Sequence, residues 1–588
     1  MTNNNIETTP ELTPQNQYRI PPEFNGVQVN FCKNPECENF GIPALVEGKF
    51  KRGLKDRYKL LGSSKSQPTL HCLACDEYIP VKSNQGISEE ISRMIDGNTS
   101  IVECCPDSEC SNHHVSITTP KAYQSFGKTK SGSNRYRCKA CMKTFAVGSV
   151  STRYQKQPEI TKQVFKLLMN KSPFRRICEV VDIHPETLYH RIDFLAQQCN
   201  SFMAHHEAKL KTLNIDRLYL AVDRQDYSIN WTQRKDKRNN KFQGVATADN
   251  ETRYVFGHHL NFDEALNSDE VENETALLND LSKPLPYRRH ARAWLKNDYE
   301  RAMVKASHRN GSATLKDDIN HTYTVQESRD DIEKQEVLTS DLKLPKDGMQ
   351  IHSEYTLYAH FNYIKNLLGN VGKVRFFLDQ DSGMRAACLS AFKDEIKNRT
   401  CDAFYVSISK DLTVDEKRKF KNKSKKVFDK FRASNPDLEP NDIKLLMIKE
   451  ELKRMQEIGK WKDKWLFHPL PDMAEPEKMV CYLTDFKDYD DTHLAWLYNK
   501  ASLHGVDTYF MQARRRISIL ERPLHSASSS GRVWNGYGAY NPSTVIKLLA
   551  IFRAFTNFVL VGKDKKTPAM RLGLADRPYS YDEVIEFV

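Results

Sequence analysis

The sequence predicts a multidomain α/β protein, and three observations lead to this prediction. Nine of the 14 cysteines fall in the first 141 residues, a helical segment follows them, and a longer segment mixes strands with helices. At about 150 residues per domain, 588 residues give a prior of roughly four domains. Apolar residues make up 39% and charged residues 28%, which is typical of a multidomain protein and excludes wholesale disorder. We expect a disordered tail only over residues 1–20.

The net charge and the search for targeting signals indicate what kind of partner and location the protein has. The net charge of +12 favours a polyanionic partner. No apolar stretch reaches the length of a membrane helix, and the N-terminus has neither the basic start nor the apolar core of a signal peptide. We therefore expect no membrane partner and a cytoplasmic location, where thiols are reduced. The cysteines are then better explained as metal ligands than as disulfides.

The cysteines form a repeat, and each copy predicts a zinc site. Each copy begins C-x4-C, with Asn two residues later, and ends C-x2-C, with Ala before the last Cys. Paired cysteine knuckles separated by a β-rich loop are typical of a structural Zn²⁺ site. Buried free cysteines are the alternative. Cys104 is a spare cysteine, and His113 or His114 are alternative ligands. The predicted ribbons span residues 21–85, with Cys32, Cys37, Cys72 and Cys75, and residues 100–150, with Cys105, Cys110, Cys138 and Cys141.

Residues 155–200 show helical periodicity in three short runs. Pro173 and Pro185 begin the second and third runs, and Pro is common at the first position of a helix. The short link VDIHP favours a helix-turn-helix, whose last helix would place Thr187, His190 and Arg191 in the DNA major groove. A three-helix bundle that binds nothing is the alternative.

The following segment changes to strand periodicity. Strands are predicted at 217–231, 241–248 and 253–259, then a helix at 355–368, then strands at 374–378 and 402–410. This is the order of an RNase H-like α/β sheet. Asp223 follows the apolar run LYLAV, and Asp379 and Asp381 follow VRFFL. Carboxylates at the ends of adjacent central strands converge, although a lone Asp at a strand end is usually a surface residue.

A third carboxylate is expected on a helix after the last strand. The segment FMQARRRISILERP reads as helical up to Pro523, with Glu521 near its end. A Glu among arginines is usually a salt-bridged surface residue. The same cluster also suits a metal-binding carboxylate beside DNA, with arginines on the flanking phosphates. These arginines are Arg514, Arg515, Arg516 and Arg522.

Several of these motifs together resemble a known family. YRCKACMKTF is similar to the zinc ribbon of bacterial insertion-sequence transposases. LYLAVD, FFLDQDSG and RRRISILERP resemble the three segments of a DDE-type transposase domain, and KTPAMRLGLADRPYSYDEVIEF resembles its closing segment. The resemblance covers residues 100–588. It implies an RNase H-like nuclease domain, here 213–562, that uses two Mg²⁺ or Mn²⁺ ions to cleave transposon ends and join them to target DNA.

The resemblance also implies roles for particular residues. By position, the catalytic triad would be Asp223, Asp379 and Glu521; Asp381 competes with Asp379, and Asp226 is a weaker rival to Asp223. The partner would be double-stranded DNA, the active form a homodimer or higher oligomer, and the location the bacterial nucleoid.

The chain departs from the compact family pattern. It has an extra N-terminal ribbon, insertions at about 264–350 and 411–500, and a C-terminal tail at 563–588. We expect the insertions to be helical; the second contains a basic segment, 416–432, with interspersed phenylalanines. Two other functions stay open: a transposase-derived DNA-binding regulator with an inert nuclease domain, and a stand-alone nuclease that never joins strands.

Overall fold

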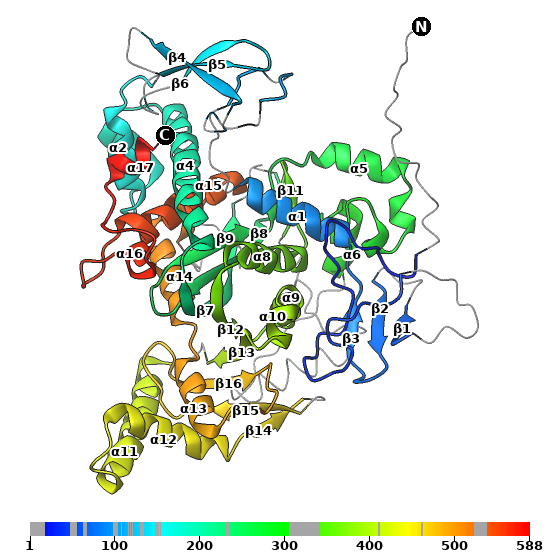
Figure 1. Cartoon of the computed structure of the whole chain (residues 1–588), viewed down its shortest axis with the longest axis vertical. Helices are drawn as coiled ribbons and strands as arrows, with labels where there is room; N and C mark the ends of the chain where they lie inside the picture. Colours follow the sequence, from blue (N-terminus) through cyan, green and yellow to red (C-terminus); the bar gives the residue numbers. More distant parts are fainter. Residues whose placement is uncertain are drawn as a thin grey trace.

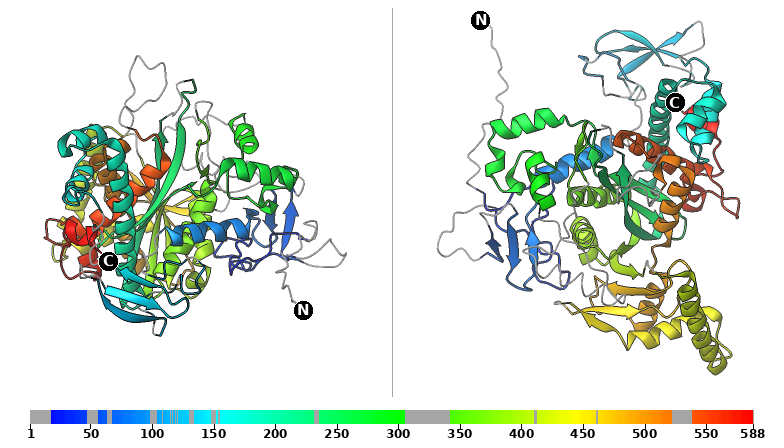
Figure 2. Two further views of the ribbon diagram at one scale, coloured as in Figure 1. Left: turned by 90° about the horizontal axis from the view of Figure 1, so that it is seen from above. Right: turned by 180° about the vertical axis from the view of Figure 1, so that it is seen from behind.

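The chain folds around one large sheet, with two small zinc-ribbon-like sheets and a helical unit attached to it (Figures 1 and 2). The structure is a computed structural model. It describes residues 18–46, 56–62, 67–97, 104–107, 109–113, 115, 117, 119, 121–129, 134–147, 152, 155–230, 235–304, 342–409, 412–459, 462–521 and 538–587.

The two small sheets lie in different surroundings. The first packs against the core through α1 (Asn84–Asp96), which lies along α8 (Ser353–Leu367). A side chain at Gly86 would place its Cβ 2.9 Å from the Tyr355 ring, so glycine permits this close approach. The second sheet stands at one end of the molecule, near α2 and α4 (Figure 1). The strands are β1 (Tyr58–Leu61), β2 (Thr69–Cys72) and β3 (Tyr78–Pro80), then β4 (Tyr123–Lys128), β5 (Asn134–Cys138) and β6 (Thr144–Val147).

Three helices cover the segment for which a helix-turn-helix is expected. They are α2 (Glu159–Leu168), α3 (Phe174–Val181) and α4 (Pro185–Glu207). Pro185 is the first residue of α4, and the His184 side chain caps the helix by accepting from the Glu186 amide. The helix continues eight residues beyond the expected end at Cys199, because its second half packs along α15 (Pro542–Ala554).

The large sheet has eight strands in the order β14-β15-β16-β13-β12-β7-β8-β9. Strands β7, β12 and β13 are parallel neighbours, and β8 and β9 continue antiparallel from β7. The central strands β12 and β13 are mostly buried, as expected for strands covered on both faces. Their bounds are β7 (Ile215–Ile229), β8 (Asn240–Asp249), β9 (Val255–Leu260), β12 (Val371–Asp379), β13 (Cys401–Ile408), β14 (Gln456–Ile458), β15 (Asp463–Phe467) and β16 (Lys478–Tyr482).

Helices cover both faces of this sheet. Thr247 of β8 bonds His360 of α8 on one face, and His258 of β9 bonds Tyr509 of α14 on the other. The first face carries α8 with α9 (Ser382–Ala391) and α10 (Lys393–Lys397). The second carries α13 (Asp491–Lys500), α14 (His504–Arg516) and α15, which continues into a π-helical turn (Phe555–Val559).

The second insertion was predicted to be helical, but it also contains strands. It begins with the hairpin of α11 (Val414–Ser434) and α12 (Pro440–Leu452), and then adds β14, β15 and β16 to the sheet edge beside β13. These strands have three to five residues each, too short for their periodicity to stand out from the Lys- and Asp-rich sequence around them. The sheet therefore has eight strands where five were expected.

The first insertion and the C-terminus also differ from expectation. Strand β10 (Phe262–Asp263) pairs with β11 (Met349–Gln350), so a short two-stranded sheet closes the first insertion. That insertion contains α5 (Ser268–Leu277) and α6 (Lys296–Val304); residues 305–341 lie outside the described part. The expected C-terminal tail forms α16 (Pro568–Leu572) and α17 (Tyr581–Ile585), and α17 packs on α2 and α4.

Buried histidines on both faces of the sheet make stability depend on pH. Burial, followed by the charge of Arg553, lowers the pKa of His258 to about 3; burial, then His258 and Arg553, does the same for His360. Their neighbours are Tyr227, Tyr509, Thr247 and His259. Because unfolded histidine titrates near pH 6.5, the unfolded chain binds extra protons between about pH 6.5 and about pH 3.

We therefore expect stability to fall as the pH drops through this window, by up to about 1.4 kcal/mol per pH unit for each histidine. Thermal unfolding followed from about pH 7.5 to about pH 5.5 should show a decreasing Tm. The variant His360→Gln should flatten this dependence. His190→Gln, at a side chain 73% exposed, should leave it unchanged. A Tm that stays constant across the range would contradict the expectation.

Candidate zinc and carboxylate sites

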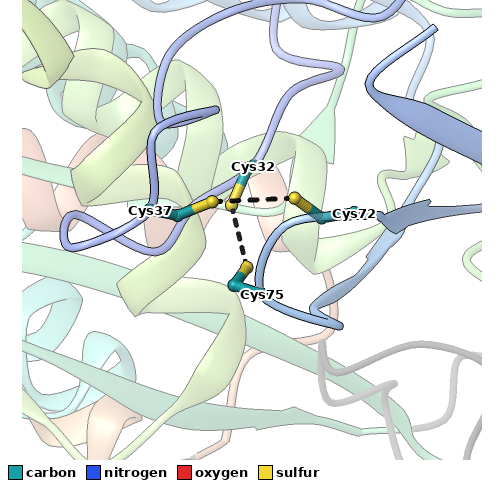
Figure 3. Close-up of side chains that lie close together, drawn as sticks. All are labelled: Cys32, Cys37, Cys72 and Cys75. Atoms are coloured by element: carbon teal, nitrogen blue, oxygen red, sulfur yellow. Dashed lines mark hydrogen bonds between the residues drawn. The ribbon is translucent and has the colours of Figure 1, made fainter. Parts of the chain in front are cut away.

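Each ribbon gathers four cysteine sulfurs into one cluster. In both, the four Sγ atoms lie within 4.8 Å of one another. Figure 3 shows the first cluster, in which Cys32 and Cys75 are 3.5 Å apart and Cys37 and Cys72 are 3.7 Å apart (Sγ–Sγ). The matching Sγ–Sγ distances in the second are 3.3 Å, Cys105 to Cys141, and 3.7 Å, Cys110 to Cys138. Tetrahedral zinc with Zn–S bonds of about 2.3 Å separates its sulfurs by about 3.8 Å.

The donor set therefore fits zinc in both ribbons. The hydrogen bond with the Cys32 thiol lowers the pKa of Cys72 to about 4, which favours the thiolate form that binds metal. The structure also describes two of the three alternative ligands, Cys104 and His113. Cys104 lies outside the cluster, and His113 Nδ1 faces the Cys105 carbonyl at 2.8 Å. His114 lies outside the described residues.

The repeat extends to the residues around the sulfurs. The Asn that follows each C-x4-C pair donates to a thiol sulfur: Asn39 to Cys72 at 3.3 Å and Asn112 to Cys138 at 3.4 Å. The upstream tyrosine hydroxyl, from Tyr58 or Tyr123, accepts from the amide of the first Cys and donates to a loop carbonyl. These shared bonds orient the ligands, which explains why the sequence repeat includes more than cysteines.

The two ribbons carry different residues at one equivalent position. Two residues after the last Cys, the first ribbon has Glu77 and the second has Lys143. Glu77 is buried; it accepts from the Lys33 amide at 2.7 Å and from Arg385 of α9 at 3.0 Å. Lys143 is exposed and pairs with Asp107 at 2.7 Å inside its own ribbon. The first zinc site is thus joined to the large domain through a buried ion pair.

Asp223 and Asp379 come from neighbouring parallel strands. Val222 of β7 pairs with Leu378 of β12, and each is followed directly by one of the aspartates. Adjacent strands are about 4.8 Å apart, so the two residues lie side by side. Asp223 is 7% exposed and shares its face with Gln225, which accepts from Arg514 of α14 at 2.6 Å. The pair therefore faces α14.

The rival aspartates have other partners. Asp381 is the N-cap of α9; its Oδ1 accepts from the Met384 amide at 2.9 Å and its Oδ2 pairs with Arg224. Asp226 is half-exposed and pairs with Lys241 at 2.7 Å. A cap and an ion pair occupy both oxygens of Asp381 in the described structure, which gives this residue a structural role.

Glu521 lies at the junction with the three-helix unit. Helix α14 ends at Arg516 rather than continuing to Pro523, and a 3₁₀ turn (Ser518–Leu520) precedes Glu521. Glu521 is 44% exposed and pairs with Lys171, in the α2–α3 loop, at 2.9 Å. Among the residues that the structure describes, the two cysteine clusters are the only groups of three or more potential ligands, so Glu521 does not join Asp223 and Asp379 here.

The arginines near Glu521 have separate neighbours. Arg514 bonds Gln225, as above, and Arg516 Nη1 donates to the Met169 carbonyl at 3.3 Å. Arg515 is exposed, and Arg522 lies outside the described residues. Arg516 therefore links the end of α14 to the three-helix unit.

The helix α4 presents only part of the expected surface. His190 is exposed and Thr187 is half-buried, but Arg191 is 8% exposed and donates to the Lys156 carbonyl. Position in the sequence placed Arg191 on the outer face, whereas in α4 it points back toward the preceding loop. The exposed side instead includes Tyr189, which the sequence analysis missed.

Other residues of these sites were also missed from sequence. Arg224, Lys171 and the Glu77–Arg385 pair have no local motif, because their partners are far away along the chain. Only Glu77 could have been singled out from the sequence, because the corresponding position of the second ribbon is a lysine.

No family model matches the chain, and no curated protein is significantly similar to it. Among the described helices, none has the length and apolar character needed to cross a bilayer.

Proposed function

We propose that the protein is a DDE-type DNA transposase, which binds transposon ends and catalyses metal-dependent DNA strand cleavage and strand transfer. The observation that carries this proposal is the central sheet. The strand order β9-β8-β7-β12-β13, with Asp223 and Asp379 side by side on its two central strands, supports an assignment to the RNase H-like class. The resemblance of the sequence motifs to insertion-sequence transposases supports the same function.

In this proposal Asp223 and Asp379 hold two Mg²⁺ or Mn²⁺ ions, with Glu521 as the third carboxylate. Oxygen ligands suit these ions, whereas the thiolate clusters suit Zn²⁺. The ions, when bound, activate the attacking oxygen and stabilise the leaving oxygen. In cleavage, water attacks a phosphorus and the 3′-oxygen leaves as a hydroxyl; in joining, that 3′-hydroxyl attacks a target phosphorus, and the 3′-oxygen of the target strand leaves in turn. The Asp381 cap and its pair with Arg224 hold the segment that carries Asp379.

DNA binding is assigned to the three-helix unit and the neighbouring arginines. Thr187 and His190 of α4 would face the major groove, and Arg514 and Arg515 would face phosphates near the aspartates. Duplex phosphate near the α2–α3 loop would compete for Lys171 and release Glu521 toward the aspartates. Two transposon ends require two copies of the chain, so the active form is a dimer or larger.

A DNA-binding regulator with an inert nuclease domain is the second candidate. The exposed Lys171–Glu521 ion pair favours it, because this pair keeps the third carboxylate in another contact. Both candidates bind DNA, so only catalysis separates them.

A cleavage and joining assay tests the proposal. Labelled duplex from the flanks of the gene is incubated with the full chain and Mg²⁺ or Mn²⁺, and wild type is compared with Glu521→Gln. Cutting and joining that the variant loses would support the transposase. Cutting without joining would indicate a nuclease, and tight binding without cutting in either metal would indicate the regulator.

A further inference from the structure

The helix α11 is long and almost unsupported. Its 21 residues include no buried side chain. It begins with a capping box, in which Thr413 and Glu416 bond each other's amides. Its main contacts are with α12, and Ser424 donates a hydrogen bond to the Pro469 carbonyl at 2.7 Å. Figures 1 and 2 show it at the opposite end of the molecule from α2–α4.

The helix has one packing side, which carries its aromatic residues. Lys417, Phe420, Ser424, Phe428 and Phe431 are the half-buried residues there, at the spacing of one helix face. Four exposed lysines lie on the opposite side, at positions i, i+4, i+7 and i+11. We name this set the lysine stripe: Lys419, Lys423, Lys426 and Lys430.

None of the four lysines of the lysine stripe forms a salt bridge among the described residues, although the charge of Lys419 lies close enough to Glu416 to lower its pKa. The helix contains nine Lys or Arg and three acids, and only Arg418 forms an ion pair there, with Asp415 at 3.3 Å. Lys419 and Lys423, like Lys426 and Lys430, are like charges at i and i+4, which destabilises a helix. Because this repulsion destabilises the helix, a row of four such lysines indicates that an external anion binds there.

We propose that the lysine stripe binds the phosphate backbone of DNA outside the catalytic site, without reading base sequence. A rise of 1.5 Å per residue spreads the four ammonium groups over about 16 Å. Duplex DNA carries one charge per about 1.7 Å of its axis, so a strand passing along α11 offers a phosphate to each lysine. Lysine stems are flexible point charges suited to such contacts. This inference depends on the proposed function in one respect, because it takes DNA as the polyanion that the lysines bind.

Salt dependence of DNA binding tests this inference. The full chain carrying Lys→Gln at all four positions of the lysine stripe is compared with the wild type and with Lys→Arg at the same positions. Each lost phosphate contact lowers the slope of log K against log salt by about 0.9, so the Gln variant should lose about 3–4 in slope. Its affinity for duplex of unrelated sequence should fall about 10–100-fold near 0.1 M salt. The Arg variant keeps the charge and should match the wild type.

The outcomes are distinct from those of the cleavage assay. A changed slope in a protein that never cuts DNA would support this inference while the transposase proposal fails. An unchanged slope in the Gln variant would overturn the inference, whatever the cleavage result. So would binding to phosphatidylserine vesicles that depends on the lysine stripe while duplex binding does not. If circular dichroism shows lost helix, the double variant Lys419→Gln/Lys430→Gln replaces the fourfold one, with an expected slope change of about 2.

Discussion

Replacing Asp379 with Asn should abolish strand cleavage while leaving DNA binding intact. The neutral side chain keeps the shape but removes a ligand charge from the proposed metal site. Metal ions supply several kcal/mol of transition-state stabilisation, and about 4 kcal/mol corresponds to about 10³-fold in rate. Asp223→Asn should have the same effect, because both residues lie side by side on β7 and β12. Cleavage rate and Mn²⁺ binding measured by calorimetry check this prediction.

The double variant sharpens the test. If the two aspartates act as one unit, the combined loss of rate should be no larger than either single loss. Asp226→Asn is the matched control: it lies on the same strand but pairs with Lys241, and should keep full activity. Loss of DNA binding in Asp379→Asn, or full cleavage by it, would count against the assignment.

Removing one thiolate from each ribbon should have unequal consequences. Cys72→Ser should lose the first zinc and destabilise the large domain, because detaching that ribbon leaves Arg385 without Glu77. Breaking a buried ion pair costs about 3–5 kcal/mol, which corresponds to a fall in Tm of about 10 °C. Cys138→Ser should lose the second zinc with the main unfolding transition unchanged, because that ribbon stands at the end of the molecule.

Zinc content and thermal unfolding of the two variants check this asymmetry. We expect two zinc ions in the wild type and one in each variant. Glu77→Gln serves as a further control: it should keep both ions and lose only part of the stability. Equal falls in Tm for Cys72→Ser and Cys138→Ser would contradict the prediction.

The parts of the fold that sequence could predict are those with a strong local pattern. The cysteine repeat predicted that eight cysteines form two clusters, because both spacings occur twice. Apolar runs ending in aspartate predicted β7 and β12, and their order predicted that Asp223 and Asp379 meet. Contacts between residues far apart in the sequence could not be predicted. Strands β14–β16 are short, Arg191 turns toward a loop carbonyl, and Glu521 pairs with a lysine 350 residues away.

Docking of the first ribbon has a consequence for how the chain is made. Glu77 and Arg385 are 308 residues apart. At about 5–20 residues per second, a ribosome needs about 15–60 s to synthesise the chain between them. During that time the docking face of the nascent ribbon has no partner, and a zinc ion bound to its four cysteines would hold the ribbon in shape.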